Sequence, residues 1–171
     1  MRVLDLSWGM AGPLATMLLA DNGAEALKVE APSGPRRSEP GSLVWERGKR
    51  SIALDLASPP DAEALRCLAK RADVLVESGP GTLLDQAGLA YETLSHANPG
   101  LVYCSISPFG AQGPWKELWG DEGVVQAKAG AMATQVGFRD SGPVYVAAPV
   151  GSYGAACLAV QGIAAALHVR A

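Results

Sequence analysis

The feature that most constrains the fold is a repeated alternation of short apolar segments with segments that carry helix signals. Strand-like segments occur at residues 3–6, 25–30, 51–56, 73–77 and 101–107, and helix-like segments at 11–24, 58–72 and 121–135. Strands separated by helices form βαβ units and a mostly parallel sheet. We therefore expect an α/β fold with helices on both faces of the sheet and ligands bound beyond the carboxyl ends of the strands.

The end of the sequence predicts a corner where chemistry is often found. Residues 143–150 are expected to be extended and to lead through a glycine turn into a last helix from about Tyr153. Because the first N–H groups of a helix lack partners and favour negative charge, Ser152 at this corner is a candidate site residue. It could be a working group, the remnant of one, or an N-cap. A nucleophile elbow requires G-x-S-x-G, and Val150 stands at the first of these positions.

Composition narrows the classes of function. With 171 residues, 49% of them hydrophobic, the chain is long enough for one globular domain. A net charge of −3 without a basic stripe argues against nucleic-acid binding. The chain has three cysteines and no CxxC motif, which fits a protein of a reducing compartment. We expect the cysteines to be small residues of the core. The start lacks the pattern of a signal peptide, and the apolar stretch 155–167 is too short to cross a bilayer comfortably, so we expect a cytoplasmic protein without a membrane span.

Other charged or ligating residues leave alternatives open. The two histidines, His96 and His168, lie far apart and the cysteines are not clustered, so no metal site is predicted. No GxGxxG follows the first strand, which gives a dinucleotide site little support. Asp121 and Glu122 open a predicted helix and are either helix-start charges or functional carboxylates. Four basic residues flank the loop that follows the predicted strand 25–30, and they are either solvated charges or contacts to phosphates: Arg36, Arg37, Lys49 and Arg50.

Several long segments carry a family resemblance. They are "VLDLSWGMAGPLATMLLADNGAEALKVEAPSG" (3–34), "RGKRSIALDL" (47–56), residues 72–114 and "DEGVVQAKAG" (121–130). In order and spacing the chain resembles the family III CoA-transferases, which include formyl-CoA transferase, carnitine CoA-transferase and α-methylacyl-CoA racemase. The resemblance implies that residues 1–171 form a Rossmann-like N-terminal domain that binds CoA. Chains of this family are usually more than twice as long, and two of them interlock.

The resemblance also implies a mechanism and a ligand set. In the transferases an aspartate attacks the acyl-CoA thioester and passes CoA to a carboxylic acid, and Ser152 occupies that position here. The histidine of the racemases falls at Asp121. The family's "ENF" is Glu77-Ser78-Gly79 here, an arginine is replaced by Gln86, and Trp8 stands where a histidine or arginine is common. The expected contacts to CoA are Met10, Ala11, Lys49, Arg50, Leu54, Ser78 and Gly79.

Two hypotheses follow from these departures. The first is an active acyl-CoA transferase in which Glu122 or Asp121 supplies the carboxylate, or another chain supplies the nucleophile. The second is a non-catalytic half that pairs with an active partner chain in a homo- or hetero-oligomer. In both, CoA is the ligand, and an acyl-CoA and a carboxylic acid are the substrates.

Overall fold

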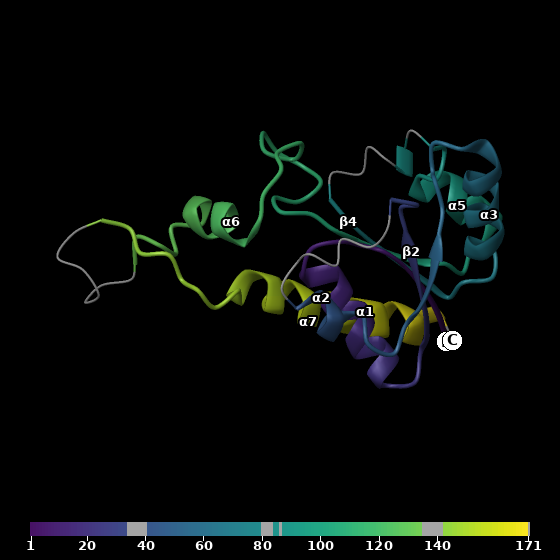
Figure 1. Ribbon diagram of the computed structural model, residues 1–171, viewed down its shortest axis with the longest axis horizontal. Helices are drawn as coiled ribbons and strands as arrows, with labels where there is room; N and C mark the ends of the chain where they lie inside the picture. The colour runs from purple at the N-terminus through teal and green to yellow at the C-terminus, as the bar shows by residue number, and fades with distance from the viewer. Residues whose placement is uncertain (34–40, 80–83, 86, 135–141, 171) are drawn as a thin grey trace.

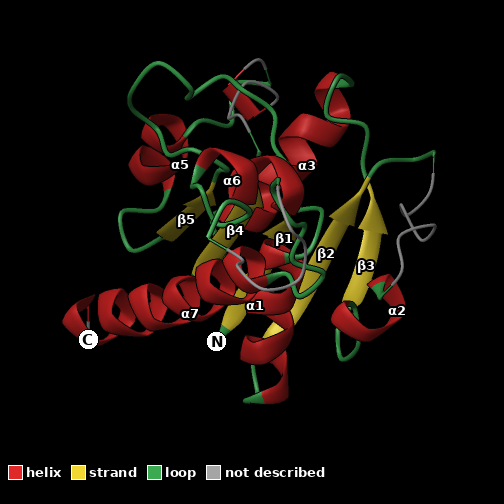
Figure 2. Ribbon diagram, turned by 90° about the vertical axis from the view of Figure 1, so that its left-hand side faces the viewer, coloured by secondary structure: helices red, strands yellow, loops and turns green. Residues whose placement is uncertain are grey.

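A five-stranded, wholly parallel sheet forms the centre of the protein (Figures 1 and 2). The computed structural model describes residues 1–33, 41–79, 84–85, 87–134 and 142–170. The strands are β1 (Arg2–Leu6), β2 (Glu25–Glu30), β3 (Arg50–Ala53), β4 (Val74–Ser78) and β5 (Val102–Ile106). Their order in the sheet is β3-β2-β1-β4-β5. After β1, the chain adds β2 and β3 on one side of that strand, and then adds β4 and β5 on its other side. The strand order therefore reverses between β1 and β4. Open α/β sheets bind ligands at such a reversal.

Helices cover both faces of the sheet, as the sequence predicts. They are α1 (Ala11–Asp21), α2 (Ser42–Trp45), α3 (Pro59–Ala69), α5 (Tyr91–Ala97), α6 (Glu122–Lys128) and α7 (Val150–Arg170). Figure 2 shows α1 and α7 side by side on one face. The strands serve two cores because successive side chains point to opposite faces. Leu4 and Leu75 pack with the α3 and α5 side chains, whereas Val3 and Val74 pack with those of α1 and α7.

The turn from β1 into α1 brings two backbone segments unusually close. A Cβ at Gly12 would collide with the Cβ and Oγ of Ser7, so only glycine fits there. The helix then starts at Ala11 without a side-chain cap, and Pro13 occupies its first turn, where the missing N–H costs nothing. This tight turn places the start of α1 directly beside the carboxyl end of β1.

Several predicted elements have other bounds or surroundings in the structure. Segment 51–56 is a strand only up to Ala53, and the helix predicted over 121–135 ends at Lys128. The segment expected to be extended, 143–150, adds no strand to the sheet, and its last residue, Val150, already belongs to the helix. Cys67 and Cys157 are exposed free thiols rather than core residues.

The last helix is longer than expected. It starts at Val150 and runs for 21 residues, so the argument that an apolar stretch here is too short to cross a membrane is wrong. By length and composition α7 could span a bilayer, which is weak evidence because core helices of globular domains pass the same test. In this structure α7 packs on α1 and β5 and buries Ala156 and Ile163.

Candidate functional site

The start of α7 lies at the carboxyl edge of the sheet. The other end of the helix is at the amino edge, because Arg170 donates to Asp73 and to the Gly100 carbonyl, just before β4 and β5. One turn into the helix, Ala156 packs in a small core that includes Leu14 of α1. The corner around Ser152 therefore lies at the edge where parallel sheets bind ligands, as the sequence predicts.

Glu122 caps the start of α7 across a gap of about 30 residues of sequence. Its Oε1 accepts from the Gly151 N–H at 2.9 Å, and its Oε2 accepts from the Ser152 N–H at 2.8 Å. The Ser152 hydroxyl donates to the same Oε2 at 2.6 Å. Gln126 Nε2 adds a fourth donor to Oε1 at 2.9 Å. A carboxylate of the chain itself thus occupies the positive end of the helix.

This arrangement corrects two expectations about the corner. Ser152 is the third residue of α7 rather than an N-cap before it, and its hydroxyl is a donor to a carboxylate. The corner is also not an empty anion site, because the N–H groups of Gly151 and Ser152 already have a partner. Burial alone would raise the pKa of Glu122, but the hydrogen bonds from Ser152, Gln126 and Gly151 outweigh it and hold that pKa below its ordinary value.

Gln126 ties the segment before α7 to this carboxylate. Its side-chain amide donates to the Val146 carbonyl at 3.1 Å as well as to Glu122. The Gln126 Oε1 is buried and has no hydrogen-bond partner among the residues that the structure describes. A Cβ at Gly151 would lie 3.1 Å from Glu122 Oε1, so a side chain there would push the carboxylate away. Gln126 and Gly151 therefore both position Glu122.

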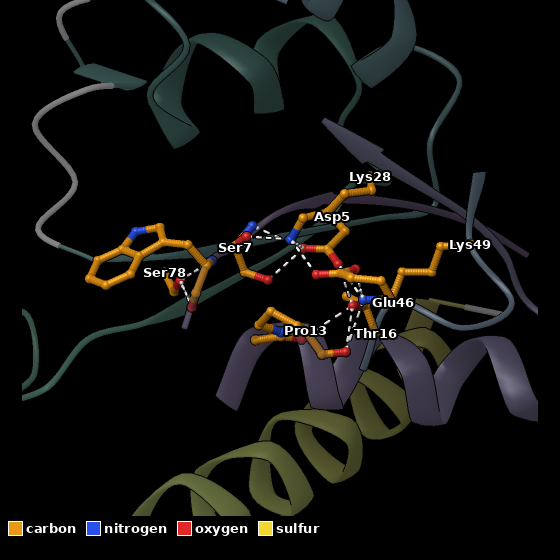
Figure 3. A network of polar contacts seen from close by, with 10 residues as sticks. Asp5, Ser7, Pro13, Thr16, Lys28, Glu46, Lys49 and Ser78 are labelled. Atoms are coloured by element: carbon orange, nitrogen blue, oxygen red, sulfur yellow. Dashed lines mark hydrogen bonds and ion pairs between the residues drawn. The ribbon is translucent and has the colours of Figure 1, made fainter. Parts of the chain in front are cut away.

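A second carboxylate, Asp5, lies fully buried at the carboxyl end of β1 (Figure 3). Its oxygens accept from the Ser7 N–H at 2.9 Å, the Ser7 hydroxyl at 2.5 Å and the Thr16 hydroxyl at 2.5 Å. Two ammonium groups complete the shell, Lys28 at 3.2 Å and Lys49 at 2.8 Å. Burial alone would raise the pKa of Asp5, but the charges of Lys28 and Lys49 outweigh it and lower that pKa.

The same network accounts for Lys49, which the sequence predicts as a contact to CoA. Its side chain is 1% exposed, and its ammonium donates to Asp5, to the Pro13 carbonyl at 2.9 Å and to Glu46 at 2.8 Å. Because an ammonium has three hydrogens, no donor remains for a phosphate in this structure. Lys49 here joins the loop before β3 to the start of α1.

The other predicted CoA contacts lie in three different places. Met10 and Ala11 are half-buried at the start of α1, Ser78 ends β4 and Gly79 follows it, so these four share the carboxyl edge. Arg50 begins β3 at the amino edge, where its guanidinium is exposed and 3.9 Å from Glu25. Leu54 is buried in the core beneath α3. Arg36, Arg37 and Gln86 lie outside the described residues.

Asp121 and His96 both have the local roles of helix-terminal residues. Asp121 is the N-cap of α6 and accepts from the Val124 N–H at 3.0 Å, which confirms the helix-start interpretation. His96 contacts the Glu92 carbonyl within α5. Among the residues that the structure describes, no group of three histidine, cysteine or acidic side chains is arranged to hold a metal.

The Asp5 network was not predicted, although the sequence contains a pattern that indicates its ion pair with Lys28. Asp5 and Lys28 each lie between two apolar residues of their strands, and they are register partners in β1 and β2. Opposite charges at matched positions on the same face of neighbouring strands predict an ion pair. The contact of Gln126 with the Val146 carbonyl has no comparable signal, because that carbonyl belongs to an irregular segment, whereas Gln126 and Glu122 are four residues apart on α6.

Together, the fold and the site define an α/β domain with a parallel sheet and a carboxylate held at a helix start beside the carboxyl edge. The sequence model of CoA-transferase family III matches residues 1–171. The chain is 40% identical over 180 residues to formyl-CoA:oxalate CoA-transferase of Streptomyces avermitilis, covering 99% of this chain and 43% of that protein. It is 39% identical over 193 residues to succinyl-CoA:mesaconate CoA-transferase of Haloarcula hispanica, covering 99% of this chain and 47% of the other.

A solved structure agrees with these matches. A hypothetical protein from Mycobacterium tuberculosis superposes with a TM-score of 0.92 at 32% identity, over 99% of this chain and 50% of that one. The chain belongs to CoA-transferase family III. It spans about half the length of these relatives. The family and the α/β, Rossmann-like fold expected from the sequence are confirmed.

Proposed function

We propose that the protein carrying this chain transfers CoA between an acyl-CoA and a carboxylic acid. The observation that carries the proposal is the family match over the whole chain, with curated relatives that are named CoA-transferases. Residues 1–171 would form the domain that binds CoA. The four predicted contacts at the carboxyl edge, Met10, Ala11, Ser78 and Gly79, are the ones whose location supports this role.

Glu122 is our candidate for the reacting carboxylate. Its lowered pKa keeps it ionised near neutral pH, as a nucleophile must be. The carboxylate would attack the thioester carbonyl carbon, the CoA thiolate would leave, and a mixed anhydride would form. The thiolate would then attack the enzyme's carbonyl of that anhydride, releasing the first acid and leaving an enzyme–CoA thioester for the acceptor. To react, Glu122 would have to release at least one of its donors from Gly151 and Ser152.

A specific observation favours the second hypothesis, a non-catalytic half. Ser152 carries a hydroxyl where the resemblance expects the catalytic carboxylate, and this hydroxyl serves to hold Glu122. In that case the protein would bind CoA and depend on a partner chain for the chemistry. A cytoplasmic location and a homo- or hetero-oligomeric assembly are part of the proposal in either form.

The test separates binding from chemistry. Calorimetric titration with free CoA should give saturable binding at the full natural length of the protein. Incubation with succinyl-CoA and hydroxylamine should then convert an enzyme acyl or thioester group into a hydroxamate at residue 122, located by peptide mass spectrometry. Glu122→Gln should abolish the modification, whereas Asp121→Asn, a change at the neighbouring N-cap, should leave it.

The three possible results have distinct meanings. Binding with modification at residue 122 supports the transferase with Glu122 as its carboxylate. Binding without modification supports the non-catalytic half. Absence of CoA binding by folded protein would contradict the proposed function in both forms.

A further inference from the structure

Two tryptophans from distant parts of the sequence meet at the carboxyl edge of the sheet. Trp8 follows β1 and Trp119 precedes α6, and their ring centroids lie 4.9 Å apart with planes inclined by 33°. Trp119 is 60% exposed, whereas Trp8 is half-buried. A partly exposed aromatic pair beside the point where the strand order reverses is placed where a ligand would contact it.

Trp8 is held in position by Ser78, the last residue of β4, and by Gly79, which follows it. The Ser78 hydroxyl accepts from the Trp8 N–H at 2.8 Å and donates to the Trp8 carbonyl at 3.0 Å. Gly79 has a φ of +114°, and a Cβ there would lie 3.0 to 3.3 Å from three atoms of the indole. The glycine thus leaves the space that the Trp8 ring fills. Residues 8, 78 and 79 all differ from the family's pattern. Because they contact one another here, the three differences form one arrangement.

The loop that carries Trp119 contains further aromatic contacts. A Cβ at Gly120 would lie 3.0 Å from the Phe109 ring, so the chain passes close to that side chain. Phe109 in turn meets Trp115 edge to face at 5.8 Å. The Lys128 ammonium lies 4.5 Å from the Trp115 centroid, which joins this loop to α6. The Trp119 ring itself contacts Trp8, so a ligand at this place would meet the two rings together.

The aromatic pair is close to the candidate reaction corner. Trp119 precedes Glu122 by three residues, and three extended residues span at most about 11 Å. This separation is short enough for the acyl group of a thioester at the Glu122 carboxylate to extend to the Trp119 ring. The ring faces are apolar and planar, so they favour apolar and aromatic groups, whereas a second carboxylate would lose its hydration against them.

We propose that Trp8 and Trp119 form the acyl-group wall and that the protein prefers acyl-CoA thioesters with apolar, above all aromatic, acyl groups. This proposal rests on the proposed function, since it requires CoA thioesters as ligands. It assigns to this chain a substrate class different from the small polar acids named for its relatives.

The test compares free CoA, benzoyl-CoA and succinyl-CoA by calorimetric titration of the full-length protein. We expect benzoyl-CoA to bind about tenfold more tightly than CoA, and succinyl-CoA to bind no more tightly than CoA. Trp119→Ala, at a largely exposed ring, should reduce the advantage of benzoyl-CoA to about threefold or less. It should leave the affinity for CoA itself unchanged. Trp8→Phe should reduce the advantage less, and Trp45→Phe, in the separate core beside α1, should not reduce it.

Other results would overturn the proposal. Equal affinity for benzoyl-CoA and CoA in the unchanged protein, or an undiminished preference in Trp119→Ala, would do so while leaving the proposed function intact. A change of oligomeric state in Trp119→Ala without a change in preference would show that the ring contacts another chain instead. Failure of all three thioester and thiol ligands to bind would overturn the proposed function together with this inference.

Discussion

Asp5 and Glu122 are two carboxylates at the same edge of the sheet, and each accepts hydrogen bonds from several groups. Asp5 is fully buried, and two of its donors are the ammonium groups of Lys28 and Lys49. Glu122 is only half-buried, and its donors are neutral N–H and O–H groups at the start of α7. Both carboxyl groups have lowered pKa values, but for different reasons.

The difference separates a structural carboxylate from one that could react. Moving Asp5 away would leave two buried ammonium groups with Glu46 as their one remaining carboxylate among the described residues, at a cost of several kcal/mol. Moving Glu122 away would expose N–H groups that water can also solvate. Glu122 can therefore change partners at a cost comparable to a helix cap, about 1 kcal/mol. This is why we propose the more exposed carboxylate for the chemistry.

The largest effect is expected from Asp5→Asn. An amide in this place cannot neutralise Lys28 and Lys49, and breaking a buried charge network costs about 3 to 5 kcal/mol of unfolding free energy. Urea denaturation measures the loss. Asp21→Asn is the control, since it removes an exposed ion pair with Arg47 and should change stability little. A loss for Asp5→Asn as small as that of the control would contradict the structural role of the network.

Ser152→Asp should produce the next largest effect. The new carboxylate would lie within hydrogen-bonding reach of Glu122, and two adjacent like charges raise the pKa of one of the pair. We expect the free energy of unfolding to be about 2 kcal/mol lower at pH 7. The second effect is that the new carboxylate occupies the position of the family's nucleophile. Denaturation measures the first effect, and trapping with acyl-CoA and hydroxylamine measures the second. A variant as stable as the parent protein would show that the two side chains do not meet.

Glu122→Gln should cost about 1 kcal/mol, because α7 loses its charged cap. The cost should also depend on pH. A carboxyl group whose folded pKa is lowered stabilises the fold fully above its unfolded pKa, near 4.5, and loses that contribution as the pH falls through the folded pKa. The stability difference between parent and variant should therefore be complete at pH 7 and shrink below about 4.5. A difference that is constant from pH 7 to pH 3 would contradict this cause.

Ser152→Ala should have the smallest effect, about 0.5 to 1 kcal/mol. It removes only the hydroxyl donor to Glu122, while the N–H groups of Gly151 and residue 152 still donate. The pKa of Glu122 should rise towards its ordinary value, which NMR titration of the side-chain carboxyl carbon can follow. If that pKa does not change, the hydroxyl does not contribute to holding the carboxylate.

The sequence by itself determined the sheet, the helices on both faces and the family. Apolar strands and the start and stop signals of helices are local patterns, and the helix expected over residues 58–72 forms over Pro59–Ala69. The position of Ser152 at the carboxyl edge was also predicted, although the described residues between β5 and α7 form no strand before it. Even the Asp5–Lys28 pair could have been found, since it needs only strand register.

Only the tertiary structure decided what each site residue touches. It placed Lys49 inside a charge network, put Arg50 at the opposite edge and paired Ser152 with Glu122. It also brought Trp8 and Trp119 together across more than 100 residues of sequence. These contacts depend on the paths of irregular segments, and such segments carry no periodic pattern from which their contacts could be predicted. Local sequence fixes where an element begins and which side it buries, whereas long-range packing fixes which polar groups find each other.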